Sequence, residues 1–94
     1  MKEQQYQSKM IKYLESRGAY VVKIGVASKA GVPDILACYK GFMVGVEMKT
    51  PTTRNNVSKL QKYNLGKIKD CGGYSLVAVE TSEVDFILDD IDER

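Results

Sequence analysis

Apolar side chains recur at helical spacing near the start of the chain, with lysine and glutamate between them. These side chains are Tyr6, Met10, Tyr13 and Leu14, and Gly18 follows shortly after them. A period of three to four residues is typical of one face of a helix, and glycine commonly ends a helix. We therefore predict an amphipathic helix over residues 3–17.

Three runs rich in β-branched and aromatic residues follow, and such runs favour strands. They cover residues 19–26, 34–39 and 42–49, with a loop of glycine, serine and lysine over residues 27–32. Lys40-Gly41 separates the second run from the third and fits a tight turn between antiparallel strands. We predict a strand, a loop and a β-hairpin in this order.

The second half of the chain contains two further helical patterns and one more strand. Residues 50–57 hold a proline, an arginine, threonines and two asparagines, and this composition predicts an exposed loop. Ser58 with Gln61 three residues later forms a capping-box pattern at the start of a helix. Residues 74–79 predict a fourth strand, and Ser82 is the expected cap of a last helix. The apolar stripe of that helix is Val84, Ile87, Leu88 and Ile91.

The element order is therefore αβββαβα, and the length allows one domain. The chain has 94 residues, of which 44% are hydrophobic and 28% charged, as in an ordinary folded protein. We expect a single domain over residues 1–94, because a second core would find no chain. There is no run of about 18 apolar residues that could span a membrane and no hydrophobic leader. We expect a cytoplasmic protein.

The absence of histidine excludes more classes of enzyme chemistry than any other feature of the composition. The chain has no histidine and only two cysteines, Cys38 and Cys71, which we interpret as buried free thiols. Histidine is the commonest general base near neutral pH and the commonest metal ligand, so histidine-dependent hydrolases and zinc sites are excluded. Any metal would be held by oxygen ligands, which favours Mg²⁺ or Mn²⁺.

The net charge of +2 hides an uneven distribution. Residues 1–70 carry 13 lysines and arginines against 5 acids, whereas residues 71–94 carry one arginine against 7 acids. The basic part could meet a polyanion such as a nucleic acid by releasing its counterions. From charge alone, lysines that solubilise exposed helix faces explain the pattern as well.

The predicted hairpin brings two acids together. If Lys40-Gly41 is a two-residue turn, opposed residues have numbers that sum to 81, and Asp34 then lies opposite Glu47. Opposed side chains point to the same face of a sheet, with Cβ atoms about 5 Å apart. Lys49, two residues beyond Glu47, shares that face.

Two bare carboxylates at such a distance repel by about 3 kcal/mol at an effective dielectric constant of about 20. A divalent cation, a shared proton or the neighbouring Lys49 could each relieve this repulsion. From spacing alone, a metal site and an ordinary cross-strand salt cluster explain the three residues equally well.

The sequence around these residues resembles a nuclease superfamily. Gly31-Val32-Pro33-Asp34, followed by Glu47-Met48-Lys49, is similar to the motif of the PD-(D/E)xK nucleases, and the element order is similar to their restriction-endonuclease-like core. With Thr50-Pro51 and Ser58-Lys59-Leu60-Gln61, the chain resembles the VRR-NUC family more closely, in particular its small stand-alone phage members.

The resemblance implies a role for each matching residue. Asp34, Glu47 and the main-chain carbonyl of Met48 would hold Mg²⁺ or Mn²⁺, and Lys49 would orient the nucleophile and stabilise negative charge. Glu3 matches the family's N-terminal acid, although an acid in the first turn also favours the helix dipole. The matching glutamine is the one in the predicted capping box, and we expect that it cannot cap the helix and reach the site at once.

Four further residues are candidates for contacts with a nucleic-acid backbone. Ser28 and Lys29 lie in the loop before Asp34, and Arg54 and Lys59 flank the loop after the third strand. Each is by default a solvated surface residue, because a single exposed lysine or arginine carries little information.

We predict a metal-dependent, structure-specific DNA endonuclease that needs no small-molecule cofactor. The resemblance to small VRR-NUC proteins and to archaeal-type junction resolvases implies a homodimer that makes paired incisions in branched DNA, such as a four-way Holliday junction. It also implies the cytoplasm of a bacterial or phage-infected cell. The alternatives are a nucleic-acid-binding module without catalysis, and a small interaction protein that docks through its acidic last helix.

Overall fold

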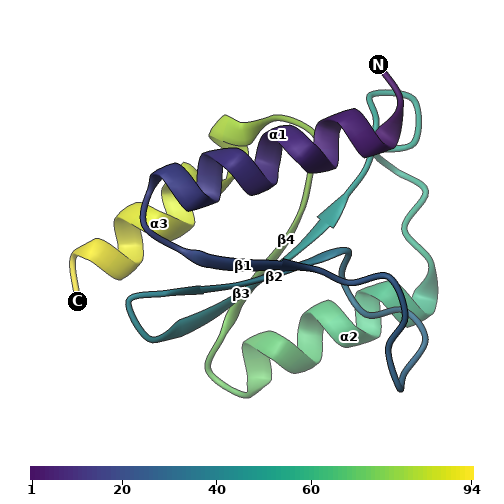
Figure 1. The fold of residues 1–94 in the computed structure, drawn as a ribbon. Coiled ribbons are helices and arrows are strands. Elements are labelled where there is room, and N and C mark those ends of the chain that lie inside the picture. Colours follow the sequence, from purple (N-terminus) through teal and green to yellow (C-terminus); the bar gives the residue numbers. More distant parts are fainter.

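The computed structural model describes residues 1–94 and contains one sheet between two layers of helices (Figure 1). Its elements are α1 (Glu3–Ser16), β1 (Tyr20–Lys23), β2 (Ile35–Tyr39), β3 (Phe42–Met48), α2 (Lys59–Asp70), β4 (Tyr74–Ala78), the 3₁₀ turn η1 (Thr81–Val84) and α3 (Asp85–Asp92). This order confirms the predicted α/β fold, αβββαβ with an additional C-terminal helix.

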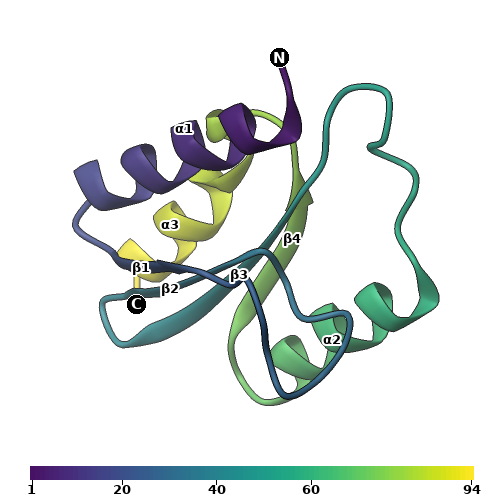
Figure 2. The ribbon, with the colours of Figure 1, turned by 45° about the vertical axis from the view of Figure 1, so that its right-hand side comes forward.

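The sheet is mixed, and its strands follow one another in chain order. Strands β1, β2 and β3 are antiparallel neighbours, whereas β4 pairs in parallel with β3 on its other edge. Helix α2 makes the crossover between the two parallel strands and covers one face of the sheet, while α1 and α3 cover the opposite face (Figure 2). Both edges of β3 are therefore paired, which places this strand at the centre of the site described below.

The hairpin has the predicted register. Ile35 pairs with Val46 and Tyr39 with Phe42, so the numbers of opposed residues sum to 81. Lys40 and Gly41 both have positive φ, at 49° and 88°. Two residues with positive φ form the tight turn whose twist matches a two-stranded ribbon, and glycine at the second position accepts this conformation without strain.

The main core lies between the sheet and the layer formed by α1 and α3. Strand residues of alternating position, such as Ile35, Val44 and Val46, are fully buried there against Met10 and Leu14 of α1. Helix α3, together with the last residue of η1, adds the stripe predicted from the sequence: Val84, Ile87, Leu88 and Ile91. Every second residue of a strand points to the same face of the sheet, and residues three to four apart in a helix lie on the same face of the helix. The apolar residues at these two spacings therefore all face this interior.

Two glycines allow α2 to approach the other face of the sheet closely. A Cβ atom on Gly45 of β3 would lie 2.8 Å from a side-chain carbon of Ile68. A Cβ on Gly31 would lie 2.8 Å from the side chain of Leu60, and Gly31 also has a φ of +81°. The loop before β2 is thereby held against the N-terminal half of α2.

The structure corrects three expectations. The first strand ends at Lys23 rather than at residue 26, because only Ile24 continues the pairing, with its N–H donating to the carbonyl of Asp34. Ser82 does not cap the last helix. Glu83 instead caps the 3₁₀ turn η1 that precedes this helix, since its carboxylate accepts hydrogen bonds from the N–H groups of Val79 and Glu80. The two cysteines are exposed, not buried.

Candidate active site

Asp34 and Glu47 lie side by side at the end of the hairpin, as the register requires. Asp34 directly precedes β2, and Glu47 is in β3. Oδ2 of Asp34 accepts a hydrogen bond from the N–H of Met48 at 2.9 Å. This bond fixes the Asp34 carboxylate across the strand from Glu47.

Glu47 is buried, and its environment disfavours its charged form. Its side chain is only 4% exposed. Burial, followed by the adjacent carboxyl group of Asp34 and its negative charge, raises the pKa of Glu47 to about 8, and the charge of Lys49 opposes this increase. An acid in this state either holds a proton or needs a cation nearby.

Lys49 supplies part of that positive charge. Its side chain is 10% exposed, and Nζ lies 3.8 Å from Oε2 of Glu47. Nζ also donates a hydrogen bond to Oε1 of Gln61 at 3.3 Å. The ammonium group is thus held between β3 and α2, on the same face of the sheet as Glu47.

Gln61 caps α2 and reaches the acid pair at the same time, which corrects the expectation that these roles exclude each other. Its Oε1 accepts a hydrogen bond from the N–H of Ser58 at 2.9 Å, and Oγ of Ser58 accepts one from the N–H of Gln61. Its Nε2 donates to Oε2 of Glu47 at 3.3 Å. The amide has two ends, so the capping box itself aims the NH₂ group at the site.

The donor set fits a hard divalent cation. It consists of carboxylate oxygens, which Mg²⁺ and Mn²⁺ prefer, and a buried acid pair whose repulsion a cation would relieve. No three acidic, histidine or cysteine side chains converge into a preformed cluster. Glu3, which is exposed on α1, does not complete such a cluster, so Asp34 and Glu47 would share the metal with main-chain oxygen, water or substrate.

The four residues predicted to contact a nucleic-acid backbone differ in their exposure and in their hydrogen-bond partners. Ser28, Lys29 and Lys59 are exposed. Arg54 is not free, because its guanidinium group makes two hydrogen bonds of 2.8 Å to the carboxylate of Glu83. We therefore expect Arg54 to hold the loop after β3 against η1 more than to contact a phosphate.

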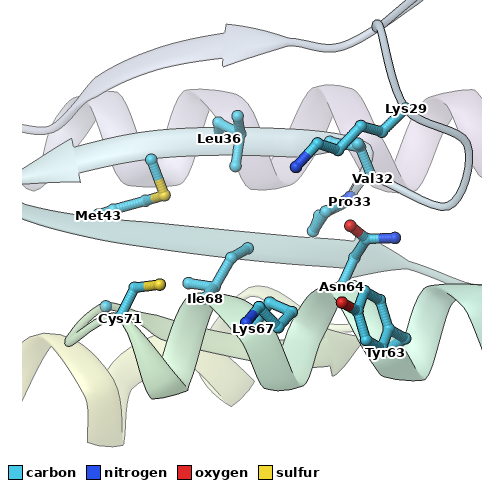
Figure 3. Close-up of a pocket in the computed structure, with 11 residues that line it drawn as sticks. Lys29, Val32, Pro33, Leu36, Met43, Tyr63, Asn64, Lys67, Ile68 and Cys71 are labelled. Carbon is cyan, nitrogen blue, oxygen red and sulfur yellow. The ribbon is translucent and has the colours of Figure 1, made fainter.

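Lys29 lies between two hollows on the side of α2. One, of about 370 Å³, is lined by the loop from Ile24 to Val32 and by Asp34. The other, of about 470 Å³, is a mainly apolar groove between α2 and the sheet, in which Lys29 faces Tyr63 and Asn64 (Figure 3). Of the four candidate contacts, only Lys29 lines a hollow together with Asp34.

Gln7 is a residue near the site that the sequence reasoning did not single out. It lies one helical turn after Glu3 on α1, is 6% exposed, and donates a hydrogen bond from Nε2 to Oε2 of Glu3. Its spacing could have identified it in the sequence. Gln7, Met10 and Leu14 form one buried stripe of α1, and Gln7 is the polar residue in that stripe.

The fold and the site together define a nuclease of the PD-(D/E)xK class. An acid before the second strand, an acid and a lysine at the end of the third, and a glutamine at the start of the following helix converge on one face of the sheet. A model of the archaeal Holliday junction resolvase family, Hjc, matches residues 2–93. The chain belongs to this family and is a metal-dependent, structure-specific endonuclease.

A solved structure agrees with this assignment at the level of the fold. The protein described as a VRR_NUC domain superposes with a TM-score of 0.73 at 22% sequence identity, over 93% of this chain and 94% of that one. No curated protein matches the chain. The structure contains no helix with the length and apolar character needed to cross a membrane.

Proposed function

We propose that the chain is a single nuclease domain that cuts four-way DNA junctions as a homodimer, with Mg²⁺ or Mn²⁺ held by Asp34, Glu47 and the carbonyl of Met48. The observation that carries this proposal is the buried acid pair, in which Glu47 has a raised pKa and faces the ammonium group of Lys49. An acid in a purely structural salt cluster can stay exposed to water, which stabilises its charge. The burial of Glu47, which leaves its charge in need of a nearby cation, therefore favours a functional site.

The side chains divide the work at the scissile phosphate. A bound cation would lower the pKa of a coordinated water and offset negative charge on the phosphate. Asp34, fixed by the N–H of Met48, keeps its carboxylate in position to bind this cation. Lys49 donates to the attacking oxygen and stabilises the charge that develops in the transition state. Gln61 orients both Glu47 and Lys49 through its amide.

Contacts with the DNA backbone would come from the exposed loop and helix start beside the site. Lys29 lines the hollow that Asp34 also lines, and Ser28 and Lys59 are exposed. Phosphate contacts at fixed separations select a DNA shape without reading its bases. The acidic helix α3 lies on the opposite face of the sheet and therefore does not repel the substrate (Figure 2).

We assign the dimer contact to the part of the sheet that α2 leaves uncovered. Tyr20, Cys38 and Met43 form one row across β1, β2 and β3, and all three are exposed. Tyr20 is 73% and Met43 50% exposed. A second copy would cover this row by two-fold symmetry, which also supplies the second active site that paired incisions across a junction require.

Two experiments test this function. Labelled four-way junction and linear duplex of the same sequence are incubated with the protein in Mg²⁺, in Mn²⁺ and in EDTA; we expect the junction to be cut preferentially and only with metal. Equal rates on both substrates would contradict the shape selectivity. Light scattering should show a dimer that Met43→Asp dissociates. Phe86→Asp should leave it intact, because Phe86 is 67% exposed on α3, on the opposite face.

We place this activity in the cytoplasm of a bacterial or phage-infected cell, where branched DNA arises during replication and recombination. The proposal follows from the substrate and the family, and recovery of junction cleavage from the cytoplasmic fraction of cells that express the chain is its test.

A further inference from the structure

Gln7 carries the only buried side-chain polar atom that has no hydrogen-bond partner. Its Oε1 is fully enclosed and unpaired. The residue lies in the stripe of α1 that faces the core, together with Met10 and Leu14. A buried amide oxygen without a partner carries a desolvation penalty, which an apolar residue at this position would avoid.

The other end of the amide shows how the side chain is oriented. Nε2 donates to Oε2 of Glu3 at 3.4 Å. A carboxylate only accepts hydrogen bonds, so the NH₂ group must face Glu3 and Oε1 must point away from it. Gln7 is thus fixed at one end by an acid of the site and left open at the other.

Glu3 is within electrostatic reach of Glu47 but does not join the acid pair in a cluster. Its negative charge contributes to the raised pKa of Glu47. In both ribbon views the N-terminal end of α1 lies beside the segment that leaves β3 after Met48 (Figures 1 and 2). Gln7, one turn further along α1, contacts Glu3 and makes no hydrogen bond to Asp34 or Glu47.

We infer that Gln7 is a positioning residue of the nuclease site. Its amide N–H orients the carboxylate of Glu3 toward the cation that Asp34 and Glu47 would hold, and the unpaired Oε1 is the cost of this orientation. This inference rests on the proposed function, because Glu3 needs to be oriented only if the acid pair holds a cation. Residues that orient metal ligands typically change metal affinity about 10–100-fold when they are replaced.

The test measures metal binding separately from cleavage. Mn²⁺ is titrated calorimetrically, without DNA, into the wild type, Gln7→Met, Glu3→Gln and the double variant. Gln7→Met fills the same volume with an apolar chain, so we expect it to be at least as stable as the wild type in urea. Gln7→Asn keeps the amide but is too short to reach Glu3, and it serves if the methionine variant does not fold. Gln4→Met on the exposed face of α1 is the matched control.

We expect Gln7→Met and Gln7→Asn to weaken Mn²⁺ binding about tenfold or more, and Gln4→Met to leave it unchanged. The double variant should bind no more weakly than Glu3→Gln alone, because Gln7 acts through Glu3. Mn²⁺ affinity unchanged in a folded Gln7 variant would overturn the inference while leaving the proposed function standing. Failure of the wild type to bind Mn²⁺ would overturn both.

Discussion

The metal-free protein should become less stable as the pH rises through neutrality, because of Glu47. A carboxyl group whose pKa is raised in the folded state binds a proton there more tightly than in the unfolded chain. Its contribution to stability is therefore fully present below the ordinary pKa of 4.5 and is lost as the pH rises to about 8, the folded-state value.

The expected size of this loss follows from the two pKa values. Over the interval from pH 5 to pH 8 the folded protein keeps a proton that the unfolded chain has released, which lowers the free energy of unfolding by roughly 3 kcal/mol. Few other groups titrate in this interval, since the chain contains no histidine. A change of this size is a large fraction of the stability of a small domain.

Urea unfolding in EDTA, followed by circular dichroism at pH 5, 6, 7 and 8, measures the effect. The matched variant is Glu47→Gln, which keeps the shape of the side chain and removes its titration, so its stability should change little over the same range. Addition of Mn²⁺ should restore the stability of the wild type at pH 8, because the cation binds the ionised acid pair only in the folded state. A flat profile for the wild type, or an equal slope in Glu47→Gln, would show that this reasoning is wrong.

Four further substitutions separate the roles of the neighbouring residues. Lys49→Ala should lower the single-turnover cleavage rate at least 100-fold, yet leave junction affinity in Ca²⁺ within a few-fold of the wild type in a filter-binding assay; equal losses would make Lys49 an ordinary phosphate contact. Ser58→Ala removes one half of the capping box and should lower the free energy of unfolding in urea by about 1 kcal/mol, with little change in the cleavage rate. Gln61→Ala should reduce both the stability and the cleavage rate. A Gln61→Ala variant that loses only stability would show that Gln61 acts as a helix cap alone. Glu83→Gln should lower the free energy of unfolding by about 1–2 kcal/mol at pH 7, because Arg54 and two N–H groups hold the pKa of Glu83 at about 2. This stability is present above pH 4.5 and lost toward pH 2, so the difference between the wild type and Glu83→Gln should shrink in acid. A difference that stays constant with pH would contradict the assignment.

The acid pair could be predicted from the sequence because its geometry follows from one local feature. A two-residue turn at Lys40-Gly41 fixes the register of the hairpin, and the register alone places Asp34 opposite Glu47. The start of the last helix could not be predicted in this way. Ser82 and Glu83 are adjacent, and only the path of the chain after β4 decides that Glu83 meets the N–H groups at the start of η1, while the last helix has no side-chain cap.

Long-range contacts explain what could not be predicted from sequence. The simultaneous roles of Gln61 depend on the distance between α2 and β3, which Gly45 sets by letting the helix approach. The position of Glu3 relative to Glu47 depends on how α1 crosses the end of the sheet. The spacing of residues within α1 or α2 does not determine these distances between elements. Glu3 and Gln61 could therefore be chosen as candidate site residues from the sequence, but their positions relative to Glu47 could not be predicted.

The most direct measurement of the role of the acid pair is the single-turnover cleavage of a four-way junction by Asp34→Asn in Mg²⁺. Asparagine keeps the shape of the side chain and removes one charged metal ligand. We predict that the variant remains folded, binds the junction within a few-fold of the wild type, and cuts it at least 100-fold more slowly. Cleavage by a folded Asp34→Asn within a few-fold of the wild-type rate would contradict a metal site built on Asp34 and Glu47.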